Sequence, residues 1–303
     1  MPTSPVVAGS SRRTFLQQTG LAAAGALTGS LASPALAAQA RKRPLFAAFG
    51  IVAPLARAAE LKAAGADYLV ERVADYLMPA ASDADFAAQR ERAKASPLPV
   101  VGCNVFLPPG LKCVGPEADQ AKILAWADVA FRRLQELGGR FINFGSGGAR
   151  RIPDGWTKEK ADEQFLALLK ALGPMADKAG VTIAVEQLRA QETNYLNRLA
   201  EVVAVVKQAG HPRIRVLADL YHMIVMGDGP EELGATAPFL AMVEIAEKVD
   251  RKVPGVNGDD FRPYFRAIAR AGYTGPITIE GNGTTEEIGR AFTVMEQQAR
   301  EAA

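Results

Sequence analysis

Cysteine, histidine and net charge are all scarce in this chain. Of its 303 residues, two are cysteines and two are histidines, and the 35 basic residues nearly balance the 33 acidic ones. Two cysteines are too few for a structural zinc site. A chain without a basic excess also lacks the electrostatic footprint that a phosphate backbone requires, so we expect no nucleic-acid partner.

The two cysteines, Cys103 and Cys113, lie on either side of a Pro-Pro-Gly turn at residues 108–110. In an oxidising compartment they could form a disulfide that closes a short loop. Cys103 also lies in a strongly apolar run, which fits a buried thiol equally well. The sequence leaves both alternatives open.

Long apolar runs are missing as well, and the one uncharged stretch near the start of the chain has the features of a signal. Residues 11–16 read Ser-Arg-Arg-Thr-Phe-Leu, a twin-arginine pattern, and Ala35-Leu36-Ala37 supplies a small-x-small cleavage site. A membrane anchor is the alternative, but the run between them is shorter than the roughly 20 apolar residues of a spanning helix. We predict a twin-arginine signal peptide at residues 1–37, export to the periplasm, and no membrane segment in residues 38–303.

Short apolar, β-branched runs alternate with longer segments of helical period in the rest of the chain. The eight strand candidates are residues 45–49, 68–71, 100–106, 141–144, 183–187, 215–219, 242–246 and 277–280. The helix candidates between them include residues 116–137, 158–179, 193–208 and 261–271. Eight strand–helix units without a linker predict an α/β fold with one domain, a (β/α)8 TIM barrel over residues 38–303. A doubly wound open sheet is the alternative, but no glycine-rich phosphate fingerprint follows an early strand.

Acidic residues stand on the last four strand candidates. Glu186, Asp219 and Glu280 each end an apolar run, and Glu244 interrupts Met-Val-Glu-Ile-Ala. In a parallel barrel the carboxyl ends of all strands meet at one rim, where active sites are built. Four carboxylates there repel one another unless a cation or protons neutralise them. Each could instead be a surface acid at a strand end, but their shared position favours a metal site formed by Glu186, Asp219, Glu244 and Glu280.

Oxygen ligands suit a hard divalent ion such as Mg²⁺ or Mn²⁺, and an imidazole close by favours Mn²⁺ or Co²⁺. That imidazole is His222, three residues after the sixth strand candidate, which can be a ligand or can donate to a substrate oxygen. We therefore predict one divalent metal ion, Mn²⁺ in preference to Mg²⁺ or Co²⁺. Glu247 and Arg251 follow the seventh strand, where a solvated loop is the alternative. The residues expected to contact substrate are His222, Glu71, Asn104, Glu247 and Arg251.

Three segments resemble the sugar phosphate isomerase/epimerase family of the xylose isomerase-like TIM barrel superfamily. They are Ala-Val-Glu-Gln-Leu-Arg at 184–189, Ala-Asp-Leu-Tyr-His-Met at 218–223, and Gly-Tyr-Thr-Gly-Pro-Ile-Thr-Ile-Glu-Gly at 272–281. The resemblance runs from Leu45 to the end of the chain. It implies a metal held by Glu186, Asp219 and Glu280, with His222 in contact with substrate. The seventh strand departs from the family, because Glu244 stands where a histidine ligand is usual; it either replaces that ligand or weakens the site.

The resemblance implies abstraction of a proton next to a carbonyl, through an enediolate, with Glu186 and Glu280 as base and acid. Epimerisation, isomerisation and loss of a β-oxygen by a lyase or dehydratase all pass through the enediolate. Two activities therefore remain open: a sugar isomerase/epimerase, and a lyase acting on a keto-sugar or keto-glycoside. Export favours an unphosphorylated carbohydrate as the small-molecule substrate. A non-catalytic exported sugar-binding barrel is the alternative from another class. The superfamily's DNA-repair branch needs more histidines than the two present. The sequence leaves open whether the chain forms a homo-oligomer.

Overall fold

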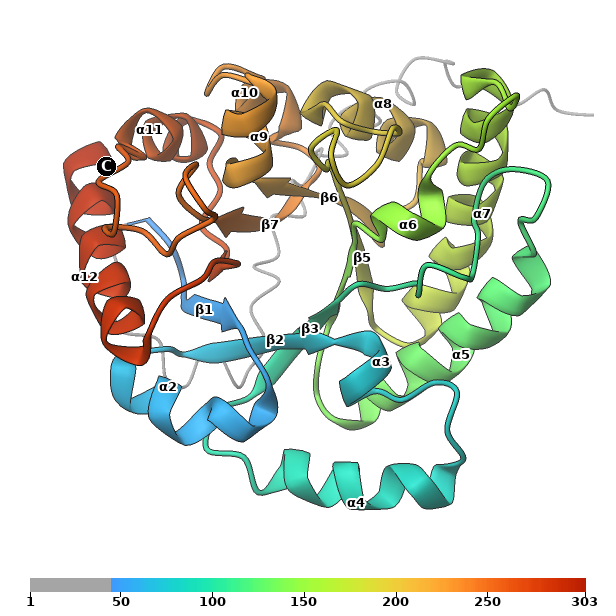
Figure 1. Cartoon of the computed structure of the whole chain (residues 1–303), viewed down its shortest axis with the longest axis horizontal. Coiled ribbons are helices and arrows are strands. Elements are labelled where there is room, and N and C mark those ends of the chain that lie inside the picture. Colours follow the sequence, from blue (N-terminus) through green and yellow to red (C-terminus); the bar gives the residue numbers. More distant parts are fainter. Residues whose placement is uncertain (1–44) are drawn as a thin grey trace, which may run out of the picture. The chain divides into compact units, whose positions relative to one another are not determined.

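The computed structural model describes residues 45–303, so the predicted signal peptide lies outside the described residues. Eight parallel strands pair in chain order and the last pairs with the first, which closes a barrel (Figure 1). They are β1 (Phe49–Val52), β2 (Tyr68–Arg72), β3 (Val100–Asn104), β4 (Phe141–Phe144), β5 (Thr182–Glu186), β6 (Ile214–Asp219), β7 (Leu240–Ile245) and β8 (Ile277–Ile279). The predicted (β/α)8 TIM barrel is confirmed, and the open-sheet alternative is wrong.

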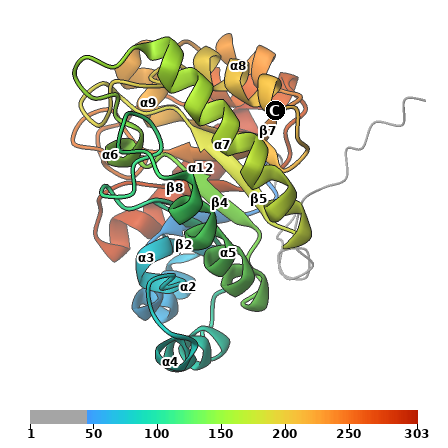
Figure 2. The same cartoon turned by 90° about the vertical axis from the view of Figure 1, so that its right-hand side faces the viewer.

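Helices alternate with the strands and lie outside them (Figures 1 and 2). The longer ones are α2 (Ala58–Ala64), α4 (Asp83–Lys94), α5 (Gln120–Glu136), α7 (Lys158–Lys178), α8 (Leu199–Ala209), α9 (Leu220–Met226), α11 (Arg262–Arg270) and α12 (Thr285–Ala302). Single turns form η1 (Leu55–Arg57), α3 (Val73–Tyr76), α6 (Gly147–Arg150) and α10 (Glu232–Thr236). Within the described residues, no helix combines the length and the apolar character needed to cross a membrane.

Helix α7 shows how the local sequence produces these elements. The side chain of Thr157 caps the helix by accepting from the Lys160 N–H, which satisfies one of the donors left free at a helix start. Phe165, Leu168, Leu169 and Leu172 recur at helical spacing and are buried. That stripe faces the strands, so the helix gains its stability by covering the barrel.

The first strand begins at Phe49, where the predicted one ends. Leu45 and Phe46 are buried but precede the strand, so their apolar character misled the prediction. Gly50 follows the predicted strand but lies within β1, where the ring of Tyr68 packs against it. A Cβ at Gly50 would lie 2.1 Å from Tyr68 Cε2.

The predicted helix at residues 193–208 is wrong at its start, since α8 begins at Leu199. The segment before it is a loop whose backbone is held by side-chain hydrogen bonds. Asn197 Nδ2 donates to the carbonyl oxygens of Leu188 (2.6 Å) and Thr193 (3.1 Å). Leu196 has a φ of 56°, which no helix continues. Tyr195 and Leu196 are buried in this loop, so apolar spacing alone could not distinguish it from a helical turn.

Cys103 and Cys113 are both buried and neither is in a disulfide. Burial raises the pKa of the Cys113 thiol to about 12, and it raises the pKa of Cys103 well above its usual value. Of the two alternatives that the sequence left open, the structure has the buried thiols.

Alternation along the strands divides their side chains between the barrel interior and the helix layer. On β2, Tyr68 and Val70 face inward, and the Tyr68 hydroxyl lies 2.8 Å from that of Thr278 on β8. Leu69 faces outward and joins the large apolar cluster beneath the helices. Side chains therefore fill the interior, and polar groups reach solvent at the rim where the strands end.

Candidate functional site

The ends of the last four strands bring four carboxylates together. Glu186 ends β5, Asp219 ends β6, Glu244 lies near the end of β7, and Glu280 follows β8. The register places Asp219 beside Glu244, and Glu244 beside Thr278 on β8. One oxygen from each of the four carboxylates lies within 4.8 Å of those of the others. All four residues predicted as metal ligands therefore share one small volume.

Three of these carboxyl groups are buried and that of Glu280 is partly buried, which makes their negative charge costly. Glu186, Asp219 and Glu244 are 6%, 1% and 1% exposed. Burial, followed by the charges of Glu280 and Asp219, raises the pKa of Glu186 well above its ordinary value. The pKa of Glu244 rises for the same reasons, led by burial. Burial raises the pKa of Glu280 to about 7, against the lowering effect of Arg251. The cluster needs positive charge to hold four carboxylates in their ionised form.

Several polar atoms of the cluster point into it without a partner. Glu186 Oε1, Glu244 Oε2 and His222 Nε2 are buried and have no hydrogen-bond partner among the described residues. Buried polar atoms are almost always paired, so each unpaired one calls for an explanation. Four converging carboxylates supply oxygen ligands of the kind that suits a hard divalent cation. The residues present fit such an ion.

Glu186 is positioned from both sides. A Cβ on Gly145, just after β4, would lie 2.3 Å from Glu186 Oε2, so only glycine leaves room for this carboxylate. Behind the strand, the fully buried Arg150 donates from Nη1 to the Glu186 carbonyl oxygen at 2.6 Å. Burial lowers the pKa of Arg150 to about 10. It is a positioning residue that sequence reasoning missed, because its contact is with backbone.

Asp219 caps a helix as well as joining the cluster. Its Oδ1 accepts from the N–H groups of Tyr221 (2.7 Å) and His222 (3.3 Å), the first turn of α9. This leaves Oδ2 directed at the other carboxylates. The short spacing between Asp219 and His222 that marks the sequence therefore has a structural cause.

His222 is fully buried, and burial lowers its pKa, so the ring is neutral. Its Nδ1 accepts from the Arg189 backbone N–H at 3.2 Å, which places the ring proton on Nε2. Nε2 lies 3.5 Å from Asp219 Oδ2 and 3.6 Å from Glu186 Oε1. The predicted position of His222 at the rim agrees with the structure, and its N–H can donate to an oxygen that enters the site.

Two side-chain amides support the carboxylates from the first half of the barrel. Asn104, at the end of β3, donates to Glu280 Oε1 at 2.9 Å. Asn143, within β4, donates to Glu244 Oε1 at 2.6 Å. The sequence analysis named Asn104 and missed Asn143. A buried amide inside Phe-Ile-Asn-Phe was the signal that could have identified it.

Arg251 enters the cluster from the loop after β7. Its Nη2 lies 3.3 Å from Asp219 Oδ2 and also donates to Glu280 Oε2. Its Nη1 lies 3.4 Å from Glu192 Oε1, and its guanidinium carbon stands 4.7 Å from the ring centre of Tyr221. Burial alone would lower the pKa of Arg251, but the carboxylates around it raise the pKa above its ordinary value. Glu192 and Tyr221 were not named in the sequence analysis and belong to this rim.

Glu71 lies elsewhere. It faces outward from β2, the opposite face from Tyr68 and Val70, and its Oε1 accepts from the backbone N–H of Leu55. Burial raises its pKa. The structure therefore does not bring Glu71 together with the other predicted substrate contacts, because adjacent residues of a strand point to opposite faces.

Glu247 is fully buried but its carboxylate binds backbone. It accepts from the N–H groups of Gly255 (2.7 Å), Gly258 (3.0 Å) and Asp259 (3.2 Å), and also from that of Asn257. These contacts organise the loop that carries Arg251. The structure thus gives Glu247 no contact with the four carboxylates, and its role is to hold the loop.

Replacing Glu247 with glutamine should destabilise the protein by about 2 kcal/mol, because a charged acceptor of four N–H groups becomes a neutral amide. Denaturant unfolding of the purified variant measures this. Glu286→Gln is the matched control, since Glu286 is exposed on α12 and its side chain pairs with Arg290 on the same helix. That control should change stability by no more than about 0.5 kcal/mol. Equal stability of the Glu247 variant and the wild type would contradict this structural role.

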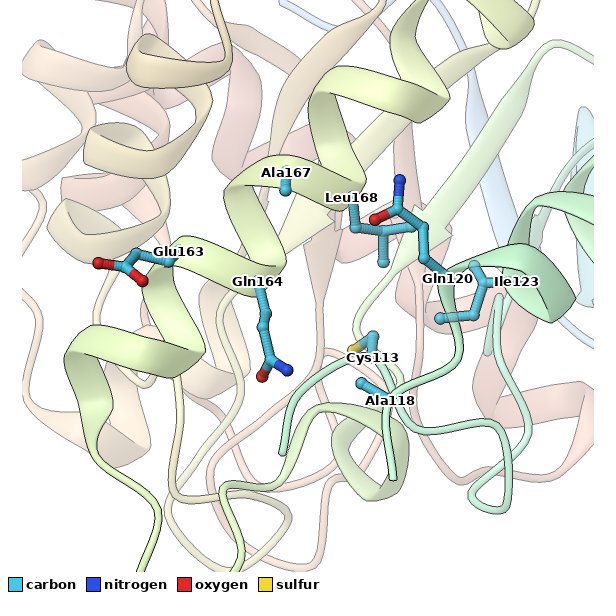
Figure 3. Close-up of a pocket in the computed structure, with 8 residues that line it drawn as sticks. All are labelled: Cys113, Ala118, Gln120, Ile123, Glu163, Gln164, Ala167 and Leu168. Atoms are coloured by element: carbon cyan, nitrogen blue, oxygen red, sulfur yellow. The ribbon is translucent and has the colours of Figure 1, made fainter. Parts of the chain in front are cut away.

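A cavity of about 290 Å³ opens between the starts of α5 and α7 (Figure 3). Cys113, Ala118 and Gln164 are among the residues that line it, and Gln164 bonds both backbone groups of Gly115. It shares no residue with the carboxylate cluster and presents no acidic cluster of its own. We therefore place the candidate site at the cluster.

The sequence profile of the xylose isomerase-like TIM barrel family matches residues 55–300, most of the chain. The chain belongs to this family. All four clustered carboxylates lie inside the matched region, and the resemblance inferred from three short segments is confirmed at the level of the family.

Sugar epimerases and isomerases are among the curated relatives of this family member. A ketose 3-epimerase of Arthrobacter globiformis is 33% identical over 114 residues, which are 36% of this chain and 39% of the relative. A putative hydroxypyruvate isomerase of Streptomyces coelicolor is 26% identical over 194 residues, 62% of this chain and 68% of the relative. A 3-dehydroshikimate dehydratase of Pseudomonas putida is 31% identical over 134 residues, 39% of this chain and 21% of the relative. The match to the ketose 3-epimerase thus spans well under half of its length.

Solved structures share the fold across the whole barrel. An L-ribulose 3-epimerase superposes with a TM-score of 0.71 at 20% identity, covering 84% of this chain and 95% of the other. A D-allulose 3-epimerase from Methylomonas sp. superposes with a TM-score of 0.68 at 22% identity, covering 84% and 98%. At these identities the likeness concerns the fold.

Proposed function

We propose that this protein is a divalent-metal-dependent sugar isomerase or epimerase that moves a proton next to a carbonyl through an enediolate. The observation that carries the proposal is the convergence of four carboxylates within 4.8 Å, two of them with an unpartnered buried oxygen. The ketose epimerase and isomerase relatives support the same reaction class. The twin-arginine sequence favours an exported protein and therefore an unphosphorylated sugar or keto-sugar.

Glu186, Asp219, Glu244 and Glu280 would hold the ion, with Mn²⁺ as the preferred metal. A bound divalent ion supplies positive charge that polarises a substrate carbonyl and favours loss of the neighbouring proton. Glu244 would serve as an oxygen ligand in place of the usual histidine, since Asn143 binds Oε1 and leaves Oε2 free to face the cluster. This arrangement supports replacement of the ligand over loss of the site.

The chain's own residues would move and stabilise the proton. Glu186 and Glu280 come from β5 and from the end of β8, which are not neighbours in the barrel, so they reach a substrate from different directions. One removes the proton and the other returns it. His222 donates from Nε2 to a substrate oxygen, because Nδ1 is already bound to the Arg189 N–H. Glu192 and Arg251 at the rim bind hydroxyl groups.

A lyase or dehydratase on a keto-sugar is the second candidate. The 3-dehydroshikimate dehydratase relative favours it, and the same abstraction step precedes loss of a β-oxygen. The two reactions differ in substrate pose and not in the residues required.

Incubation with Mn²⁺ in D2O tests the proposal. With a panel of free ketoses and keto-glycosides, an epimerase or isomerase should return sugars that carry deuterium at the carbon next to the carbonyl, as detected by mass spectrometry and NMR. A lyase would release an unsaturated keto product instead. Saturable binding of a sugar with metal in the site, without deuterium or product, would leave a binding protein and contradict the enzyme.

A further inference from the structure

Each carboxylate of the cluster has a limited number of oxygen atoms left for a metal ion. Asp219 Oδ1 caps α9, and Glu280 Oε1 accepts from Asn104. Glu244 Oε1 accepts from Asn143. The oxygens that remain are both of Glu186, together with Glu244 Oε2, Asp219 Oδ2 and Glu280 Oε2; of these, Glu186 Oε1 and Glu244 Oε2 are buried without a partner among the described residues.

Arg251 binds two of these oxygens. Its Nη2 bridges Asp219 Oδ2 at 3.3 Å and Glu280 Oε2. The guanidinium therefore occupies one available oxygen on each of two carboxylates, Asp219 and Glu280, and leaves Glu186 and Glu244 without a cation. The Arg251 guanidinium and a divalent metal ion would therefore need the same two oxygen atoms, Asp219 Oδ2 and Glu280 Oε2.

The backbone holds Arg251 in this place. Asp250 and Arg251 have φ angles of 57° and 49°, a region that non-glycine residues rarely adopt. The Arg251 carbonyl oxygen accepts from the Asn282 N–H at 2.7 Å, and its Nε donates to the Glu280 carbonyl oxygen at 2.9 Å. Loop contacts on both sides of the side chain thus direct its charge into the cluster.

Arg251 also has a partner outside the ligand set. Glu192 Oε1 lies 3.4 Å from Nη1, and the face of Tyr221 lies beneath the guanidinium. When a metal ion takes Asp219 and Glu280, the guanidinium keeps Glu192 and the Glu280 carbonyl oxygen. It can therefore release both ligand atoms without being left unpaired.

We propose that Arg251 competes with the divalent metal ion for Asp219 and Glu280, and that it holds the carboxylate cluster together when the ion is absent. This inference rests on the metal site of the proposed function. It makes the metal exchangeable, since two positive groups near the same oxygens repel each other. Arg251 thus sets the affinity for metal in addition to contacting substrate.

The test is a calorimetric titration of metal-stripped protein with Mn²⁺. Arg251→Gln removes the charge and leaves a shorter, polar side chain without the guanidinium, so it should bind Mn²⁺ at least about tenfold more tightly than the wild type. Arg189→Gln is the matched control, because Arg189 also lies over Tyr221 and pairs with Glu192 but contacts neither Asp219 nor Glu280. Its Kd for Mn²⁺ should stay within about twofold of the wild type.

Thermal unfolding provides a readout independent of activity. Without metal, Arg251→Gln should unfold at a lower temperature than the wild type, because four carboxylates lose their internal cation. Saturating Mn²⁺ should raise its Tm by more than it raises that of the wild type. If the glutamine variant does not fold, Arg251→Lys keeps the charge without the bridging fork and should give a Kd between those of the other two.

The possible outcomes separate this inference from the function on which it rests. If the wild type binds Mn²⁺ and the folded Arg251 variants bind it equally well or more weakly, the proposed competition is wrong. The proposed function would be unaffected by that result. Binding by the variant at concentrations where the wild type remains empty would support it strongly. If neither protein binds Mn²⁺, the metal site fails, and the competition and the proposed function fail with it.

Discussion

Changing Glu186 or Glu280 to glutamine should lower the rate of deuterium incorporation by at least about hundredfold, the usual effect of losing a general base or acid. Each glutamine keeps the size of the side chain but can neither accept nor return a proton. Both carboxylates lie in the cluster at the ends of their strands, and neither caps a helix. The measurement is the exchange rate at saturating Mn²⁺ and sugar.

Glu71→Gln is the matched control for this experiment. Glu71 is also a buried glutamate near the end of a strand, with a raised pKa, but it faces the helix layer and binds the Leu55 N–H. Its exchange rate should stay close to that of the wild type. A similar loss of exchange rate in all three variants would indicate a general effect of burying an amide. It would contradict the assignment of Glu186 and Glu280 as base and acid.

Asp219→Asn should weaken Mn²⁺ binding by more than about hundredfold. That is the largest loss of affinity usually seen when a residue that only hydrogen-bonds to a metal ligand is replaced. The substitution removes one negative charge from the ligand set. It preserves the helix cap, because asparagine caps helices as well as aspartate does. Metal content after dialysis and the Kd from titration both measure the effect.

Asp119→Asn controls for the change at a helix cap. Asp119 caps α5 by accepting from the Lys122 N–H at 3.0 Å and lies far along the chain from the four clustered acids. This variant should retain the wild-type affinity for Mn²⁺. A variant of Asp219 that binds Mn²⁺ as tightly as the wild type would exclude Asp219 from the ligand set.

The barrel could be predicted because the strand pattern, the helix pattern and their alternation along the chain all indicated the same fold. Apolar runs of strand length alternate with amphipathic helices, and this alternation leaves few folds to consider. Two of the boundary errors show what was missing: β1 continues past the predicted end at Phe49, and residues 193–198 form a loop. The ring of Tyr68 on β2 packs over Gly50, and Asn197 binds the carbonyl oxygens of Leu188 and Thr193 within its own loop. The spacing of apolar residues along the sequence does not reveal such side-chain contacts.

The candidate site shows the same division between local and long-range information. Glu186, Asp219 and Glu280 could be found because an acid at the end of a buried strand is costly without a function. Glu71 satisfies the same description yet faces outward, because one step along a strand reverses the side chain. The correct face became clear only from side-chain contacts: the Tyr68 hydroxyl meets that of Thr278 inside the barrel, whereas Glu71 Oε1 accepts from the Leu55 N–H.

The residues around the four carboxylates depended on contacts across the barrel. Asn143 meets Glu244 across 101 positions of the chain, and Arg150 meets the Glu186 backbone across 36. Glu247 had the charge and place expected of a substrate contact, but the loop folds back so that backbone N–H groups surround it. Nothing in its own neighbourhood of the sequence distinguishes these two uses of a carboxylate.

The shortest strand, β8, closes the barrel by joining the last part of the sheet to the first. Strand β8 has three residues, pairs with β7 on one side and β1 on the other, and is followed at once by Glu280. Glu280, the last of the four proposed ligands, is therefore in place only when β8 is paired with both neighbours, and separation of these strands would remove it. An ion that binds only the complete ligand set stabilises the paired strands by mass action. Metal occupancy and the integrity of the barrel would then be a single equilibrium.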